Sequence, residues 1–193
     1  MINRYQPYIE TASGNKVFFL EPDPDSIDIN DIALALSRIP RFNGHTNRFY
    51  SVAEHCWTGQ RFIQDEFKLS FLLHDATEAY LCDIPSPIKQ YLPDYQKLEE
   101  GLERAIFNKF GLTYPFDPLI KYIDITMLSV EAQHLVESRG NDWQLWKTMK
   151  RPIADPRMKP LCFDSKTAER LYLEAFYELF GTNRAATMAQ NTG

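Results

Sequence analysis

The stretch that decides the fold is SFLLHDATEAYLCDIPSPIK, residues 70–89. Its first half is apolar on most sides, as is typical of a helix that runs through the middle of a bundle, and its two prolines must end that helix. Within ten residues it also carries His74, Asp75, Glu78 and Asp83. Burial of an ionisable group costs several kcal/mol unless the group is paired or binds a metal. We therefore expect a metal ion to be the partner of this cluster.

The segments on both sides of this stretch also have the apolar spacing of helices. Ser51 stands three residues before Glu54, which is the spacing of a capping box. Gly111 and the pair Asp117–Pro118 are the usual signals for a helix end and a helix start. The predicted helices are INDIALALSRI (29–39), SVAEHCWTGQRFI (51–63), KLSFLLHDATEAYL (68–81), DYQKLEEGLERAIFNKFG (94–111), FDPLIKYIDITMLSVEAQHLVE (116–137), GNDWQLWKTM (140–149) and DSKTAERLYLEAFYELFG (164–181, capped by Asp164 or Ser165). They predict an all-α helical bundle.

The two ends of the chain differ from this helical middle. Short β-prone pieces, YIETA and KVFFLE, flank the turn signal SGN, and the loop PDPDS follows. Residues 1–28 therefore predict a small N-terminal β-hairpin and loop that extend the same domain. The bundle covers residues 29–181, and the polar tail TNRAATMAQNTG, residues 182–193, is expected to be frayed. A length of 193 residues fits one such domain.

Charge and composition exclude several classes of function. The net charge is −5 and the basic residues are spread along the chain, so we expect no polynucleotide partner. A small anion remains compatible, because a local pocket of Arg and Lys can hold a phosphate on an acidic protein. No apolar stretch approaches the about 20 residues that span a bilayer. The N-terminus lacks the apolar run of a signal peptide and the three cysteines are scattered, which predicts a cytoplasmic protein.

Four side chains on three predicted helices are candidate metal ligands: His55, His74, Asp75 and Asp124. Neutral imidazole and carboxylate together suit one divalent transition metal ion, namely Mn²⁺, Fe²⁺, Co²⁺, Ni²⁺ or Zn²⁺. Two ligands of each kind leave an octahedral ion with two open positions for water or substrate. Open positions are typical of a catalytic site rather than a structural one.

Glu78 completes the cluster without being a ligand. It follows His74 by four residues and Asp75 by three, so on a helix its carboxylate projects over the same region and can act on a water at the ion. A single buried histidine is more often structural, and we interpret His134 in that way; the role of His45 stays open. The combination of adjacent His and Asp with Glu78 favours the metal site.

This set of residues resembles the HD-domain superfamily of metal-dependent phosphohydrolases, whose ligands follow the order H…HD…D along an all-helical bundle. The matching residues are His55 in VAEH, His74 and Asp75 in LLHDATEAYLCDIPSPIK, and Asp124 in IKYIDITML. The resemblance covers roughly residues 29–137. It implies the HD-domain bundle as the fold and phosphate ester hydrolysis as the reaction.

Within that superfamily the chain is most similar to the bacterial 5′-deoxynucleotidases. Members of that branch follow the HD pair with a glutamate, an aspartate and a Pro-x-x-Lys-like segment, which match Glu78, Asp83 and Lys89. They also carry an arginine followed by an aromatic residue; Arg41 and Phe42 match, with Phe42 where the family residue is typically Trp. The resemblance implies catalytic roles for Glu78 and Asp83, and substrate binding by Arg41, Phe42, Lys89 and Asp83.

The implied substrate is a small-molecule nucleotide, and we favour hydrolysis of a deoxynucleoside 5′-monophosphate to nucleoside and phosphate. Arg41, Lys89 and the metal can offset its charge of about −2. A deoxynucleoside triphosphate, as in the related dATPase-like phage enzymes, brings about −4 and would need further groups such as Arg38, Arg48 and His45. A catalytically silent nucleotide-binding module is the alternative from another class.

Aromatic residues leave two further contacts open. Phe42, Phe49 and Tyr50 lie close in sequence to Arg41, where a ring can pack against a sugar or base or belong to the core. RLYLEAFYELF, residues 170–180, fits a core helix or a homodimer face, and we expect the core.

Overall fold

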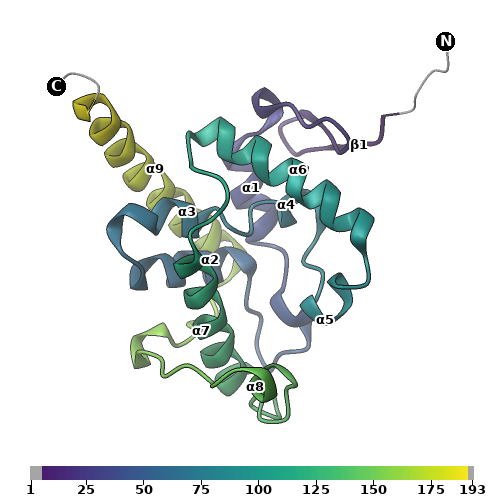
Figure 1. The fold of residues 1–193 in the computed structure, drawn as a ribbon, viewed down its shortest axis with the longest axis vertical. Helices are drawn as coiled ribbons and strands as arrows, with labels where there is room; N and C mark the ends of the chain where they lie inside the picture. The colour runs from purple at the N-terminus through teal and green to yellow at the C-terminus, as the bar shows by residue number, and fades with distance from the viewer. Residues whose placement is uncertain (1–5, 191–193) are drawn as a thin grey trace.

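The computed structural model describes the backbone of residues 6–190 and the side chains of residues 6–182. These residues form an assembly of helices with a small antiparallel hairpin near the N-terminus, which confirms the all-α class (Figure 1). In chain order the strands and α-helices are β1 (Tyr8–Glu10), β2 (Lys16–Phe18), α1 (Ile29–Leu36), α2 (Val52–Gly59), α3 (Lys68–Leu72), α4 (Glu78–Leu81), α5 (Ser86–Lys89), α6 (Pro93–Phe110), α7 (Pro118–Leu135), α8 (Leu145–Thr148) and α9 (Ser165–Gln190).

The predicted hairpin is confirmed and is tied to the bundle. Ile9 pairs with Val17 across the two strands, and Val17 is completely buried in the main core. The backbone N–H and the hydroxyl of Ser13, in the turn, donate to the two carboxylate oxygens of Asp31 on α1 at 2.9 and 2.6 Å. The described part of residues 1–28 thus packs on the helices, while residues 1–5 lie outside the described part of the chain.

Most helix ends follow the predicted signals. The N–H of Glu54 donates to the Ser51 hydroxyl at the start of α2, and the N–H of Leu119 donates to Asp117 at the start of α7. Gly111 takes the left-handed conformation that ends α6, with φ of 68°. The Glu54 carboxylate, however, does not return to Ser51 as a capping box requires. It accepts three backbone N–H groups of residues 161–163 instead.

Residues 68–81 were predicted as one helix, and this prediction is wrong in the middle of the segment. α3 ends at Leu72 and α4 begins at Glu78, with a run of turns between them. The backbone bonds there span three residues: the N–H of His74 donates to the Phe71 carbonyl, and that of Glu78 to the Asp75 carbonyl. Such bonds tighten the chain relative to an α-helix. His74 and Asp75 therefore lie on a turn rather than on a helix.

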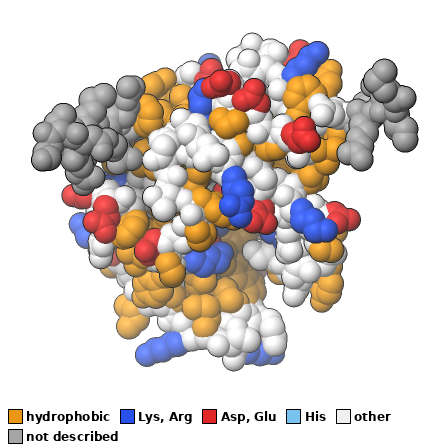
Figure 2. All heavy atoms as spheres, turned by 45° about the horizontal axis from the view of Figure 1, so that its top comes forward, with side chains coloured by type: hydrophobic (Ala, Val, Ile, Leu, Met, Phe, Trp, Pro, Cys, Tyr) orange, Lys and Arg blue, Asp and Glu red, His pale blue; other side chains and the backbone are white. Residues whose placement is uncertain are grey.

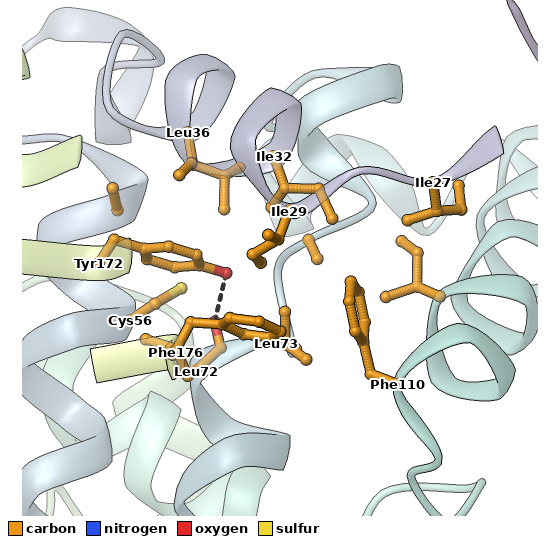
Figure 3. Packing of buried hydrophobic residues seen from close by; sticks show 14 of the residues in the cluster. Ile27, Ile29, Ile32, Leu36, Cys56, Leu72, Leu73, Phe110, Tyr172 and Phe176 are labelled. Carbon is orange, nitrogen blue, oxygen red and sulfur yellow. Dashed lines mark hydrogen bonds between the residues drawn. The ribbon is translucent and has the colours of Figure 1, made fainter. Parts of the chain in front are cut away.

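The main core lies where α9 packs against α1, α2 and α3. Figure 3 shows Tyr172 of α9 below the apolar side chains of α1, with its hydroxyl directed at the end of α3. That hydroxyl donates to the carbonyl of Leu72 at 2.8 Å. Tyr172 and Phe176 are buried, so the expectation that this helix contributes to the core is confirmed.

A close approach of α2 and α3 depends on Gly59. A Cβ atom at this position would collide with the ring of Phe71. Phe71 is completely buried and belongs to a second apolar cluster, together with Met127 of α7. The absence of a side chain at Gly59 thus sets the distance between these two helices.

The last helix runs past its predicted end. Gly181 lacks the left-handed conformation that ends α6, and α9 continues to Gln190. Several alanines in the segment 182–190 favour helix continuation. The predicted frayed tail is thus helical in its backbone up to Gln190, and residues 191–193 lie outside the described part.

The surface in Figure 2 shows Lys and Arg side chains interspersed with Asp and Glu rather than gathered into a field of one sign. Within the described residues, no helix combines the length and the apolar character needed to cross a bilayer.

Candidate functional site

The four predicted metal ligands meet in space. His55 comes from the middle of α2, His74 and Asp75 from the turn between α3 and α4, and Asp124 from α7. Nε2 of His55 lies 3.4 Å from Oδ1 of Asp124 and 3.7 Å from Oδ2 of Asp75. Nε2 of His74 lies 3.2 Å from Oδ1 of Asp75 and 4.0 Å from Oδ1 of Asp124. One atom each of His55, His74 and Asp75 lie within 4.8 Å of one another, so this cluster can bind a metal ion.

The environment of the two imidazoles fits such an ion. The His55 side chain is 0 % exposed and the His74 side chain 8 % exposed. Among the described residues, neither Nε2 atom has a hydrogen-bond partner of good geometry. A buried polar atom without a partner is costly, and a cation bound between these two atoms and the two carboxylates would give both of them a partner. The donor set, two imidazoles and two carboxylates, is one that divalent transition metals accept.

The other nitrogen of each imidazole is fixed by an acceptor. Nδ1 of His55 lies 2.6 Å from Oε1 of Glu131, and Nδ1 of His74 lies 2.7 Å from the Phe71 carbonyl oxygen. Because a carbonyl and a carboxylate accept, Nδ1 of each ring carries a proton and donates it. A bound cation in place of a second proton would therefore meet the lone pair of each Nε2 atom, which is the arrangement that orients metal-binding histidines.

Glu131 is a site residue that the sequence reasoning missed. It is completely buried and also accepts from the Tyr50 hydroxyl at 3.0 Å and from Nε of Arg41 at 3.1 Å. Burial raises the pKa of Glu131, but Arg41 and His55 outweigh it, so the pKa lies below its ordinary value and the group is ionised. The available signal was its spacing: it follows Asp124 by seven residues, about two helical turns, and so lies on the same face of α7.

The surroundings of the two histidines shift their pKa values in opposite directions. Burial and Arg41 lower the pKa of His55, while Glu131 and Asp124 raise it to about 9. Burial lowers the pKa of His74 despite Asp75 and Asp124. The pKa of Asp124 lies well below its ordinary value, because His55 and Lys121 outweigh the effect of burial. Asp124 is thus a carboxylate whose negative charge stabilises a cation beside it.

Arg41 and Phe42, both predicted to bind substrate, have different positions. Arg41 is 9 % exposed, and its Nη1 lies 3.5 Å from Oδ2 of Asp75. The Arg41 guanidinium therefore lies beside the metal cluster. The Phe42 ring lies 6.1 Å from the ring of Trp143, which precedes α8. Phe42 thus packs near residues 140–149. The Tyr50 hydroxyl donates to Glu131, and the Phe49 side chain is exposed.

Glu78 and Asp83 lie within electrostatic range of the cluster. Burial, followed by Asp75 and Asp83, raises the pKa of Glu78 well above its ordinary value. Burial also raises the pKa of Asp83, with Arg41 and Lys89 acting against it. Oε2 of Glu78 is buried and has no hydrogen-bond partner among the described residues. Glu78 can therefore carry a proton next to Asp75.

A cavity of about 280 Å³ opens beside the cluster. Its lining includes His74, Asp75 and Asp124 together with Lys89, a predicted substrate ligand, and Lys121, which the sequence reasoning did not single out. Nζ of Lys89 lies 2.7 Å from Oε1 of Glu99 on α6. Nζ of Lys121 lies 2.8 Å from Oδ2 of Asp124. Two ammonium groups thus border the space next to the candidate ligands.

The two remaining histidines lie apart from this cluster. Nδ1 of His134 donates to the Val130 carbonyl of its own helix at 2.9 Å, as a structural histidine does. His45 is exposed and follows the turn Arg41–Gly44, in which Phe42 and Asn43 have positive φ values of 56° and 51°.

No family model matches the sequence. The chain is 43 % identical over 136 residues to the uncharacterized protein YfdR of Escherichia coli, which covers 70 % of this chain and 76 % of that protein. It is 34 % identical over 137 residues to an uncharacterized protein of Rhodobacter capsulatus, which covers 64 % of this chain and 70 % of that protein. Neither name states an activity. At this level of identity and coverage, the chain belongs to the protein family that includes YfdR of Escherichia coli.

Proposed function

We propose that the protein is a metal-dependent phosphohydrolase of the HD-domain type that converts deoxynucleoside 5′-monophosphates to nucleoside and phosphate. The observation that carries the proposal is the pair of buried imidazoles, His55 and His74, whose Nε2 atoms lack partners and face Asp75 and Asp124. These four residues would hold a divalent transition metal ion, which would supply Lewis acidity for phosphate ester hydrolysis.

Cationic side chains of this chain bind and orient the phosphate. The Lys89 and Lys121 ammonium groups line the cavity, and the Arg41 guanidinium lies 3.5 Å from Asp75. Hydrolysis of a phosphate ester requires its negative charge to be offset before a nucleophile can approach. Arg41 is also held by the buried Glu131, so its orientation is set before substrate arrives.

Glu78 is the proposed proton carrier. Its raised pKa favours the protonated carboxyl, which can donate to the leaving oxygen of the nucleoside. Asp83, whose pKa is also raised, lies near Arg41 and Lys89 and orients the sugar or a water. These roles rest on the resemblance to 5′-deoxynucleotidases and on the electrostatic interaction of Glu78 and Asp83 with Asp75.

The charge of the cavity favours a monophosphate over a triphosphate. Besides Asp75 and Asp124, the cavity is lined by three glutamates of α6 and by two lysines. A triphosphate with a charge of about −4 would be repelled by these glutamates more strongly than a monophosphate with about −2. A volume of about 280 Å³ also lies just below the usual range of about 300–1,000 Å³ for ligand pockets, which favours a small ligand.

The proposal is tested with purified protein, a panel of Mn²⁺, Co²⁺, Zn²⁺, Ni²⁺ and Fe²⁺, and three classes of substrate. We expect phosphate release from deoxynucleoside monophosphates and from p-nitrophenyl phosphate, and about one metal ion per chain. Tripolyphosphate release from deoxynucleoside triphosphates would favour the triphosphatase alternative. Nucleotide binding without any turnover would favour the silent module.

Two substitutions test the site itself. His74→Ala should remove both metal and activity, with His134→Ala as a matched control, because His134 is an exposed histidine outside the cluster. Glu78→Gln should retain the metal and lower kcat by about 10²-fold or more, the scale of general acid–base catalysis. An unchanged kcat would exclude Glu78 as proton carrier.

A further inference from the structure

The wall that α6 presents to the cavity is unusual for an amphipathic helix. Gln96, Glu99, Glu100 and Glu103 line the cavity, and their spacing of three, four and seven residues places them on one face of α6. The core-facing side of the same helix is apolar and includes the buried Leu102. Carboxylates at this spacing are ordinarily solvated. Here they border a half-open cavity next to the candidate metal ligands.

The three glutamates differ in their partners. Glu100 is half-exposed and accepts from Nη2 of Arg104 at 2.6 Å. The Glu99 carboxylate forms an ion pair with the ammonium group of Lys89. Glu103 has two glutamates and the Tyr114 phenol among its neighbours, and burial, followed by Glu99, raises its pKa to about 7. Among the three glutamates of this wall, Glu103 is the one without an ion pair to a described lysine or arginine, and the Tyr114 phenol donates to it. A carboxylate has about four acceptor sites, so Glu103 can still accept a hydrogen bond from a ligand.

The rest of the cavity indicates which kind of ligand meets this wall. His74, whose buried Nε2 atom has no partner, opens onto the same space. Phe116 and the buried Ile120 add an apolar surface against which a flat ring can pack. The cavity thus combines a metal cluster with cations for a phosphate, an apolar surface for a ring, and carboxylates for hydrogen-bond donors.

We propose that Glu103, supported by Glu99, selects nucleotides whose base carries an exocyclic amino group. This inference rests on the proposed function and deepens it. An ionised carboxylate accepts hydrogen bonds but cannot donate them. Adenine, cytosine and guanine each offer an amino group, whereas thymine offers a single ring N–H between two carbonyl acceptors, which the carboxylate repels. Glu99 contributes by holding Lys89 through its 2.7 Å ion pair, so that the ammonium stays on the phosphate side.

The test compares kcat/KM for dAMP, dCMP, dTMP and p-nitrophenyl phosphate in the Mn²⁺-loaded full chain at pH 8.5, where Glu103 is ionised. For the unmodified protein we expect dAMP and dCMP to exceed dTMP by about tenfold, the scale of one hydrogen bond to a charged group. Glu103→Met should lower kcat/KM for dAMP and dCMP to the level of dTMP. The ratio of kcat/KM for dTMP to that for p-nitrophenyl phosphate, which has no base, should change by less than about twofold, because an effect of charge on the phosphate is common to both substrates.

Two further variants distinguish a hydrogen bond between Glu103 and the base from a general effect of charge on α6. Glu103→Gln keeps one acceptor oxygen and the side-chain length, so it should retain part of the preference for amino bases. Asp94→Asn, on an exposed residue of the same helix, is the matched control and should leave all four values unchanged. Circular dichroism checks that each variant is folded.

The possible failures are distinguishable. Equal kcat/KM for dAMP and dTMP in the unmodified protein would overturn the inference and leave the proposed function intact. A uniform change in all four substrates on Glu103→Met would also overturn it, because it would show an effect of charge on the phosphate alone. No phosphate release from any of the four would overturn the proposed function and the inference with it.

Discussion

Two buried carboxylates, Glu54 on α2 and Glu131 on the neighbouring α7, have different kinds of partners. Glu54 accepts from the backbone N–H groups of residues 161–163 at 2.7–2.8 Å. Glu131 accepts from the side chains of His55, Tyr50 and Arg41. Both carboxylates are 0 % exposed. Burial of a charge is therefore compatible with two roles: one carboxylate holds a loop, and the other orients side chains that have an atom left for a ligand.

The two carboxylates differ in whether their hydrogen-bond donors keep a further atom that can bind a ligand. The N–H groups on Glu54 belong to the main chain and have no second function. On the Glu131 side, His55 keeps a free Nε2 atom and Arg41 keeps Nη1 beside Asp75. A carboxylate that is satisfied by side chains thus marks a functional region more clearly than one that is satisfied by backbone.

The largest expected effect is that of removing Glu131. Glu131→Ala should lower the free energy of unfolding by about 3–5 kcal/mol, because it leaves the buried Arg41 and His55 without their shared carboxylate. Urea unfolding in the presence of a chelator measures this loss. Glu137→Ala, on an exposed residue just beyond the end of the same helix, is the control. A loss below about 1 kcal/mol would contradict the view that Glu131 holds a network.

The next effect concerns the metal. Glu131→Gln keeps the shape and an acceptor oxygen but removes the charge that makes His55 a better donor to a cation. We expect the affinity for Mn²⁺ to fall about 10- to 100-fold, the range for partners that orient a ligand. Isothermal titration calorimetry measures it, with Glu54→Gln as the control. Equal affinity in both variants would remove the distinction between the two carboxylates.

Glu54→Gln itself should act on stability. The amide replaces one acceptor oxygen by a donor, which leaves a backbone N–H of residues 161–163 facing another donor. We expect a loss of about 1–2 kcal/mol in the free energy of unfolding. The affinity for Mn²⁺ should stay within about twofold of the original. A larger drop in affinity would show that the loop, too, positions His55.

The smallest effect is a pH dependence in the acidic wall of α6. Burial and Glu99 raise the pKa of Glu103 from its ordinary 4.5 to about 7. The folded state therefore binds more protons than the unfolded state between these values, and Glu103 costs stability as the pH rises through them. Its neighbours are Glu99, Glu100, Arg104 and Tyr114.

Glu103→Gln should accordingly stabilise the protein more at pH 8.5 than at pH 5, by less than about 1 kcal/mol because the group is partly solvated. Urea unfolding at the two pH values measures the difference, with Asp94→Asn as the control. An equal effect at both values would show that Glu103 is not destabilised by its surroundings.

Much of the fold follows from local signals in the sequence. The apolar spacing predicted the long helices, and Ser51, Gly111 and Asp117 lie at the expected helix ends. The break at residues 73–77 was not predictable from apolar spacing, since bonds over three residues and bonds over four residues keep a similar pattern of buried positions. At the break, Nδ1 of His74 donates to the Phe71 carbonyl at 2.7 Å, an acceptor that a continuous α-helix would use for the N–H of Asp75.

The sequence predicted the candidate metal ligands, but it did not predict the residues that hold these ligands in place. Residue types alone pointed to His55, His74 and Asp75, which the structure brings together. The acceptors around them depend on tertiary packing. Glu131 is one carboxylate in an apolar helix, and Glu103 has the spacing of an ordinary solvated face. Only the approach of α7 to α2, and of α6 to the cavity, gives these residues their partners.

Gly59 shows that a residue without a functional group can still tolerate few substitutions. Even the methyl group of alanine at this position would push against Phe71. The carbonyl of Phe71 is the acceptor that fixes the proton of His74. Under selection for activity, a position without a side chain and outside the lining of the cavity would therefore also be restricted, because a shift of Phe71 would disturb the acceptor of His74. A survey of permitted substitutions would place Gly59 among the site residues, although its contribution is the space that it leaves empty.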